Sequence, residues 1–348
     1  MTDGLIAALL FGLSAPLSKL LLADVDPVVL AGLLYLGAGA CLAVLVGVLA
    51  ALGRRNKEAA LERRDVPWLA GAVVVGGVVA PLLLLFGLEA TPAATASLLL
   101  TLEAAATAGI AAVLFREAMG RSTWLAIGLV TAGGLLLVLD PRGGWGFSPG
   151  CLLIVGACVM WGLDNNLTRH VSLRDPKTIV ILKGLGAGTF SLLLAVALGR
   201  PLPSLGLALA ALALGAASYG ASIALFVRSL RKLGAARTGA LFGTAPFLAA
   251  GLSLAIFREP PAVTAYAAVP LVLCAAWLLA RERHEHAHAH EDTVHAHRHT
   301  HDAHHDHEPG GDAAVEGAHA HEHRHAELRH THSHRPDPHH RHPHEGTS

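Results

Sequence analysis

The stretch Phe11-Gly-Leu-Ser-Ala-Pro-Leu-Ser-Lys19 decides how the chain is organised, because it occurs twice. It returns 150 residues later as Trp161-Gly-Leu-Asp-Asn-Asn-Leu-Thr-Arg169, with an aromatic residue, Gly, Leu, a second Leu, a hydroxyl and a cation at matching positions. A second pair, Phe115-Arg116-Glu117 and Phe257-Arg258-Glu259, repeats at an offset of 142. The sequence therefore predicts two copies of one unit, and we expect the functional site where the copies meet.

Composition indicates a membrane protein. Hydrophobic residues make up 53% of the chain and charged residues 15%, whereas soluble domains contain about 25% charged residues. The four cysteines lie in apolar runs and form no CxxC pair, so we expect them to be buried packing residues. Nucleic-acid binding has no support, because the cations lie at the edges of apolar runs and in a tail that acidic residues balance.

Ten apolar runs are long enough to be transmembrane helices, each of which needs about 20 residues. They cover residues 4–22, 28–52, 68–88, 93–115, 122–139, 150–168, 178–199, 205–227, 237–257 and 262–280. Five runs fall in each half, and an odd number forces the second copy to enter from the opposite side. The predicted fold is an all-α membrane protein with two inverted five-helix repeats, residues 1–140 and 141–280, followed by a tail over 281–348.

The cations of the short loops predict the orientation. With the N-terminus inside, the inner loops hold sixteen Lys and Arg residues, and the outer loops hold three, or four if Lys19 is counted. Loops rich in Lys and Arg stay in the cytoplasm. We therefore expect a multi-pass protein of the plasma (cell inner) membrane with both termini cytoplasmic.

The chain resembles the EamA-type branch of the drug/metabolite transporter superfamily over about residues 4–280. The resemblance is carried by Gly12, Pro16 and Lys19, by their second copy Gly162, Asn166 and Arg169, and by the two Arg-Glu pairs that close helices four and nine. Pro246 fits the proline that the family often has in helix nine, whereas helix four has Glu103-Ala104 at the corresponding place. The resemblance implies a secondary carrier with alternating access, moving metabolites, amino acids or drugs without a cofactor.

Glu103 is the strongest candidate for a functional side chain. It lies near the centre of the fourth run, where a charge costs at least about 2.5–3.5 kcal/mol on insertion scales. Helical spacing puts Thr107 on the same face. We interpret Glu103 as a proton-coupling carboxylate or as the counter-ion of a cationic substrate; the alternative is a neutral glutamic acid hydrogen-bonded between helices.

Five more side chains are candidates for substrate or coupling contacts. Asp164, Asn165 and Asn166 interrupt the sixth run and either coordinate a polar substrate or ion, or simply end the helix at the cytoplasm. Lys19 either takes part in function, as the resemblance implies, or extends to the membrane surface. Tyr219 places a hydroxyl within the eighth run, where core packing is its alternative role.

The tail contains 22 of the 23 histidines, and many alternate with other residues. A period of two puts imidazoles on one side of an extended chain, and imidazole suits Zn, Ni, Co and Cu. We expect metal binding in vitro by a tail that is disordered without metal. A cellular role remains open between a metal buffer, a collector for an exporter, a pH sensor and drifted low-complexity sequence. The predicted ligands are His284, His286, His288, His290, His295, His297, His299, His301, His319, His321, His323 and His325.

Two functional hypotheses follow. The first is a secondary transporter of small solutes in the export direction, with a small molecule and the lipid bilayer as partners and a homodimer left open. The alternative is an efflux carrier for divalent Ni, Co or Zn ions, with the tail as metal collector or sensor. An intramembrane enzyme is disfavoured, because the apolar runs contain no plausible pair of nucleophile and base.

Overall fold

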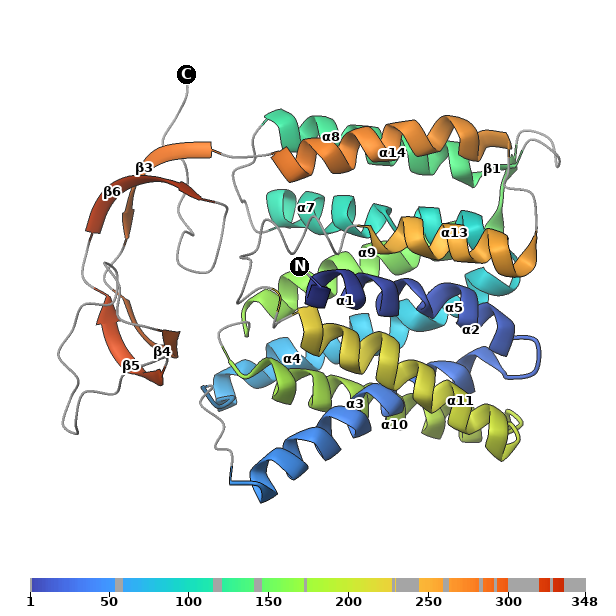
Figure 1. Ribbon diagram of the computed structural model, residues 1–348, viewed down its shortest axis with the longest axis horizontal. Helices are drawn as coiled ribbons and strands as arrows, with labels where there is room; N and C mark the ends of the chain where they lie inside the picture. The colour runs from blue at the N-terminus through green and yellow to red at the C-terminus, as the bar shows by residue number, and fades with distance from the viewer. Residues whose placement is uncertain are drawn as a thin grey trace.

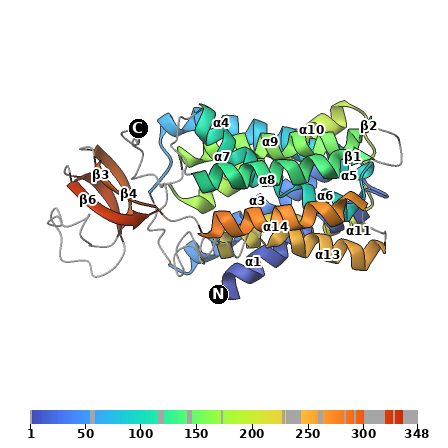
Figure 2. The same ribbon diagram turned by 90° about the horizontal axis from the view of Figure 1, so that it is seen from above.

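The computed structural model describes residues 2–53, 59–114, 121–140, 146–171, 174–226, 229, 244–258, 263–281, 284–290, 293–299, 319–325 and 328–334. Up to residue 281 it is a bundle of helices that run side by side along one direction, with the short β1 (Leu139–Asp140) and β2 (Gly146–Phe147) pairing between the repeats (Figures 1 and 2).

The helices fall into two sets of five spans. The first set is α1 (Thr2–Gly12) with α2 (Ser14–Leu21), α3 (Pro27–Ala51), η1 (Arg63–Asp65) with α4 (Val66–Ala72), η2 (Val73–Val79) and α5 (Ala80–Glu89), α6 (Ala93–Leu99) with α7 (Leu102–Leu114), and α8 (Arg121–Val138). The second set is α9 (Pro149–Arg169), α10 (Pro176–Ala197), α11 (Leu205–Gly215) with η3 (Ala216–Ala221), α13 (Ala245–Phe257) and α14 (Val263–Arg281).

These spans confirm the predicted fold class of two inverted five-helix repeats. Among the described residues, seven helices are long and apolar enough to cross a membrane, and three shorter apolar helices lie at Trp124–Leu137, Ala245–Phe257 and Val263–Ala275. The three shorter helices belong to the fifth, ninth and tenth predicted runs. Each repeat thus contributes five membrane segments to the bundle.

The second helix of each repeat begins in the same way. The carboxylate of Asp26 accepts a hydrogen bond from the backbone N–H of Val28 at 2.8 Å, and that of Asp175 accepts one from Lys177 at 3.1 Å. A proline follows each aspartate and occupies the first turn, where its missing N–H costs nothing. The two caps set where α3 and α10 enter the bundle.

Helices α3 and α10 pack closely side by side and join the repeats. A Cβ atom built on Gly184 would lie 2.7 Å from the backbone of Gly39, so only glycine permits this approach. The apolar core continues around them and draws on both repeats, with Leu30 and Leu85 from the first and Ile154 from the second fully buried. The two repeats therefore share one core.

Each repeat carries a π-helical segment in its third span. The segments are η2 and η3, and they begin 143 residues apart at equivalent places. A π-turn inserts one extra residue into a helix and is often found at functional sites. Hydrophobic periodicity did not predict either segment.

At the end of the bundle where Thr2 and Arg281 lie, here called the termini face, the two repeats are joined by buried charges. The Arg174 guanidinium contacts the carboxylates of Glu62 at 2.7 Å and Asp65 at 2.9 Å, and the side chains of Arg174 and Asp65 are only 8% and 9% exposed. The Asp175 N–H donates to the Ala59 carbonyl at 2.9 Å.

An aromatic contact reinforces this face. Trp68 of α4 stacks on His170 at the end of α9, with ring centroids 3.9 Å apart and planes at 4°. Leu69, Val171 and Ile179 form a small buried apolar cluster beside it. Together with the Arg174 contacts, these residues are called the clasp below.

The opposite face has a weaker counterpart. Asp26 and Arg200 come from the loops that correspond to those of the clasp, but their charged atoms are 3.6 Å apart and Arg200 is 47% exposed. Nearby, Lys19 donates from its ammonium group to the Leu88 carbonyl at 2.9 Å and to the Thr91 carbonyl. A cation at the C-terminal end of a helix is favoured by the helix dipole, so Lys19 stabilises the end of α5.

The described parts of the tail form paired strands. Strand β3 (His284–His290) pairs with β6 (Leu328–His334), and β4 (Thr293–His299) pairs with β5 (His319–His325), both antiparallel. Isolated two-stranded pairs are marginally stable in water, so disorder in the absence of metal stays a prediction. All but one of the predicted histidine ligands lie in β3, β4 and β5, and His301 lies outside the described residues.

Two predictions about the membrane part need correction. Cys151 and Cys158 are buried as expected, but Cys41 and Cys274 are exposed. Apolar runs in a membrane protein leave one side to lipid, so an apolar neighbourhood does not imply burial in protein. The fourth run is not one continuous helix, because α6 ends at Leu99 and α7 starts at Leu102.

Candidate functional site between the repeats

The break in the fourth span positions Glu103. At the break, the Thr101 N–H and hydroxyl both donate to the Leu98 carbonyl, at 3.1 and 2.7 Å. Glu103 then falls in the first turn of α7, where the helix dipole favours a carboxylate. The residue lies near the middle of the Ala93–Leu114 span, as predicted.

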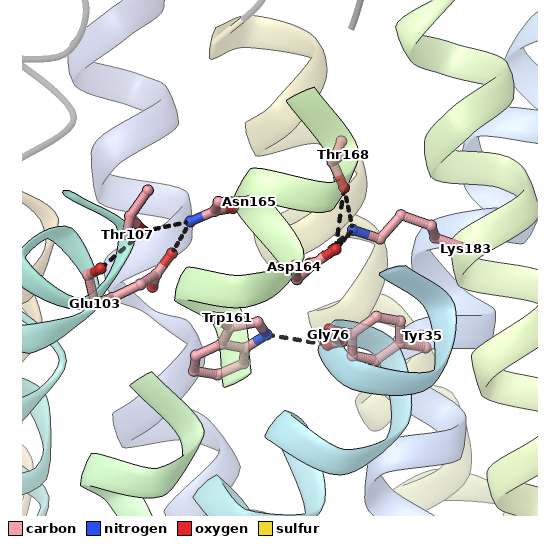
Figure 3. A network of polar contacts seen from close by, with 9 residues as sticks. All are labelled: Tyr35, Gly76, Glu103, Thr107, Trp161, Asp164, Asn165, Thr168 and Lys183. Atoms are coloured by element: carbon pink, nitrogen blue, oxygen red, sulfur yellow. Dashed lines mark hydrogen bonds and ion pairs between the residues drawn. The ribbon is translucent and has the colours of Figure 1, made fainter. Parts of the chain in front are cut away.

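Glu103 meets the second repeat through Asn165. The Asn165 side-chain N–H₂ group donates to the Glu103 carboxylate at 3.0 Å and to the Thr107 hydroxyl at 3.1 Å (Figure 3). The Thr107 hydroxyl donates to the Glu103 carbonyl at 2.8 Å. The predicted shared face of Glu103 and Thr107 is therefore confirmed. Glu103 is half-buried and Asn165 is exposed.

Asn166 anchors the same two helices through backbone atoms. Its side-chain N–H₂ group donates to the Thr107 carbonyl at 3.0 Å and to the Gly162 carbonyl at 2.8 Å. Asn166 is buried, so its contacts hold α9 against α7. The polar triplet Asp164, Asn165 and Asn166 does not interrupt the helix, since α9 continues to Arg169.

Asp164 forms an ion pair that sequence reasoning missed. The Lys183 ammonium group of α10 contacts both carboxylate oxygens, at 2.6 and 2.7 Å, and the Thr168 hydroxyl donates to Asp164 at 3.0 Å (Figure 3). Asp164 also packs against Gly76 of η2, where any Cβ would overlap its carboxylate. Asp164 is thus neutralised within the second repeat.

The π-helix η2 offers one carbonyl to two aromatic side chains. The Gly76 carbonyl accepts hydrogen bonds from Trp161 at 3.0 Å and from the Tyr35 hydroxyl at 2.7 Å (Figure 3). Tyr219 of η3 stacks on Tyr35 with centroids 5.6 Å apart, and its ring meets Phe11 edge-on at 6.0 Å. Tyr219 therefore belongs to a ring cluster drawn from both repeats.

The remaining candidates lie away from this group. Lys19 is held at the end of α5, so the structure does not bring it to Glu103 or Asp164. Arg258 ends α13 in the left-handed conformation with φ of 52°, as a helix-end residue would. Arg116, Glu117 and Glu259 lie outside the described residues.

The described part of the chain contains no group of three or more His, Cys, Asp or Glu residues placed to hold a metal ion. At the repeat interface, one carboxylate pairs with an amide and the other with an ammonium group. Nothing in this geometry supports the metal-efflux alternative.

A bundle of two inverted repeats, with polar side chains meeting between them at membrane depth, defines a multi-pass membrane transporter. The EamA-like transporter family matches residues 4–139 and 148–281. The chain belongs to this family, one copy of the family unit in each repeat.

One relative agrees with this assignment, and one solved structure agrees with the fold. An uncharacterized transporter of Methanothermobacter thermautotrophicus is 30% identical over 273 residues, which cover 73% of this chain and 78% of that protein. A solved structure titled "Crystal structure of protein" covers 80% of this chain and 94% of its own, with a TM-score of 0.57 and 21% identity. At that identity the solved structure supports the fold alone.

Proposed function

We propose that the protein is a secondary transporter that exports small organic solutes of the metabolite, amino-acid or drug class by alternating access. The observation that carries the proposal is the hydrogen bond from Asn165 of the second repeat to Glu103 of the first. A carboxylate at this depth costs at least about 2.5–3.5 kcal/mol and commonly marks a transport pathway. Transporters of inverted-repeat type place their sites near the midplane between the repeats.

The hydrogen bond between Asn165 and Glu103 could also break and re-form as the site opens and closes. Glu103 begins a half-helix, and discontinuous helices line substrate sites in many carriers. A substrate or a proton that takes the place of the Asn165 amide on Glu103 would change the contact between the repeats. The same side chain would then couple binding to their relative movement.

The charges of the loops support the orientation of the transporter. The topology predicted from the sequence puts sixteen Lys and Arg residues in the loops on the side of the termini, and such loops remain cytoplasmic. The termini face is therefore the cytoplasmic face in this proposal, and the membrane is the plasma membrane of the cell.

The test is a Glu103→Gln variant in membrane vesicles, assayed by counterflow with labelled amino acids, amines and drug-like solutes. We expect transport of the recognised solute to fall about tenfold or more, because each 1.4 kcal/mol lost from the transition state is a factor of ten. Glu89→Gln is the matched control, since Glu89 is an exposed carboxylate at the end of α5. Undiminished transport by Glu103→Gln at equal membrane abundance would refute the proposal.

A further inference from the structure

Among the described residues, no cation forms an ion pair with Glu103. Its side-chain partner is the Asn165 amide, which is neutral. The nearby ammonium group of Lys183 is committed to Asp164 at 2.6 and 2.7 Å. Because an isolated carboxylate in a low-dielectric site is costly, Glu103 is stabilised when it gains a proton or a cationic ligand.

Aromatic rings lie in the same region. Phe11, Tyr35 and Tyr219 come from three different spans, contact one another through Tyr219, and are all half-buried. Trp161 lies one helical turn before Asn165 on α9, and its indole N–H donates to the same Gly76 carbonyl as the Tyr35 hydroxyl (Figure 3), so this turn of α9 connects the rings with Glu103. Aromatic faces attract organic cations by cation–π interaction.

We propose that this site binds a protonated organic amine, with its ammonium group on Glu103 and Asn165 and its apolar body against Phe11, Tyr35 and Tyr219. The proposal rests on the transport function above and names the substrate class of that site. The Asn165 carbonyl oxygen can accept from an ammonium group, as can the carboxylate. An anionic solute would instead meet an unpaired carboxylate.

Inorganic divalent cations fit the site less well. Mg²⁺ and Ca²⁺ take six or more oxygen ligands, and a zinc site needs three or four N, S or carboxylate ligands. The site offers one unpaired carboxylate and one amide, and the described residues contain no larger ligand group. A monovalent ammonium group balances a single carboxylate.

The test measures binding to the purified full-length protein in nanodiscs with three probes of similar size and different charge. These are phenethylamine, phenethyl alcohol and hydrocinnamate, which are cationic, neutral and anionic at neutral pH. We expect the amine to bind at least about tenfold more tightly than the other two, which corresponds to 1.4 kcal/mol. Equal or tighter binding of the alcohol or the anion would overturn the proposal.

Variants locate the binding to this site. Glu103→Gln and Asn165→Ala should weaken amine binding, the first about tenfold or more, while Glu89→Gln leaves it unchanged. Tyr219→Leu should weaken it by a few-fold, since a cation–π contact contributes about 0.5–2 kcal/mol. Amine binding that survives both Glu103→Gln and Asn165→Ala would overturn the assignment. Asn165 is exposed, so Asn165→Ala keeps the test valid if Glu103→Gln fails to fold.

Counterflow separates this proposal from the transport function on which it rests. Glu103-dependent transport of an anionic or neutral solute, without recognition of the amine, would refute the amine site and leave the transport function standing. If no solute of the panel shows Glu103-dependent transport, both proposals fail.

Discussion

The two ends of the bundle join the repeats with contacts of different strength. At the termini face, Arg174 contacts two carboxylates at 2.7 and 2.9 Å and is 8% exposed. At the opposite face, Arg200 lies 3.6 Å from Asp26 and is 47% exposed. Removing one partner of a buried ion pair is strongly destabilising, whereas an exposed pair contributes little. The equivalent loops of the two repeats therefore form ion pairs of different strength at the two ends of the bundle.

The difference bears on the proposed alternating-access mechanism. An alternating-access carrier opens its two faces in turn, and the clasp must separate if the termini face is the one that opens. Among the described residues, buried charges and stacked rings join the repeats at the termini face, whereas the ion pair at the opposite face is exposed and longer. On the proposed mechanism the opposite face is the easier one to open.

The largest expected effect comes from Arg174→Ala. It removes the cation that faces the buried Asp65, and the loss of one partner of such a pair costs about 3–5 kcal/mol. A clear drop in the melting temperature of the solubilised protein is the readout. Arg64→Ala is the matched control, because Arg64 also pairs with Glu62, at 2.6 Å, but is 64% exposed. Equal destabilisation by the two variants would show that the buried Arg174 pair is no stronger than the exposed Arg64 pair.

An intermediate effect is expected at the aromatic stack. The pair of Trp68 and His170 should contribute about 0.5–1.5 kcal/mol beyond its buried area. A double-mutant cycle with Trp68→Ala and His170→Ala isolates this interaction energy. Additive effects of the two substitutions would mean that the stack does not help to hold the termini face.

A small effect is expected from Arg200→Ala. An exposed ion pair contributes about 0–1 kcal/mol, and added salt weakens it further. The melting temperature should change little and should become indistinguishable from wild type in high salt. A loss as large as that of Arg174→Ala would remove the contrast between the two faces.

The smallest effect on the bundle is expected from deleting residues 284–348. The tail has almost no large apolar side chains that could extend the core of the helices, so the melting temperature of the membrane part should not change. Titration with Ni²⁺ should show binding to the full chain and none to the truncated one, because neutral imidazole is a good ligand for this ion. Nickel binding of equal strength after truncation would contradict the predicted tail site.

The spans were predictable because membrane helices need long apolar runs. Glu103 and Thr107 could be placed on one face, since four residues separate them along a helix. In each case the information is local, within a few residues of the sequence.

The contacts between distant segments could not be predicted. Lys183 and Asp164 lie on different helices, so no helical spacing reveals their pairing. Arg174 and Asp65 are joined across more than a hundred residues. The signal that could have pointed to Lys183 is its position: it is a cation within an apolar run, and such a charge needs a partner.

The π-helices bear on the history of the chain. Segments η2 and η3 occupy equivalent positions in the two halves, and each represents one inserted residue. Two independent insertions at the same place are less economical than one. The simplest history puts the insertion in a single-unit ancestor, before gene duplication and fusion produced the present chain, which makes this irregularity older than the two-repeat protein itself.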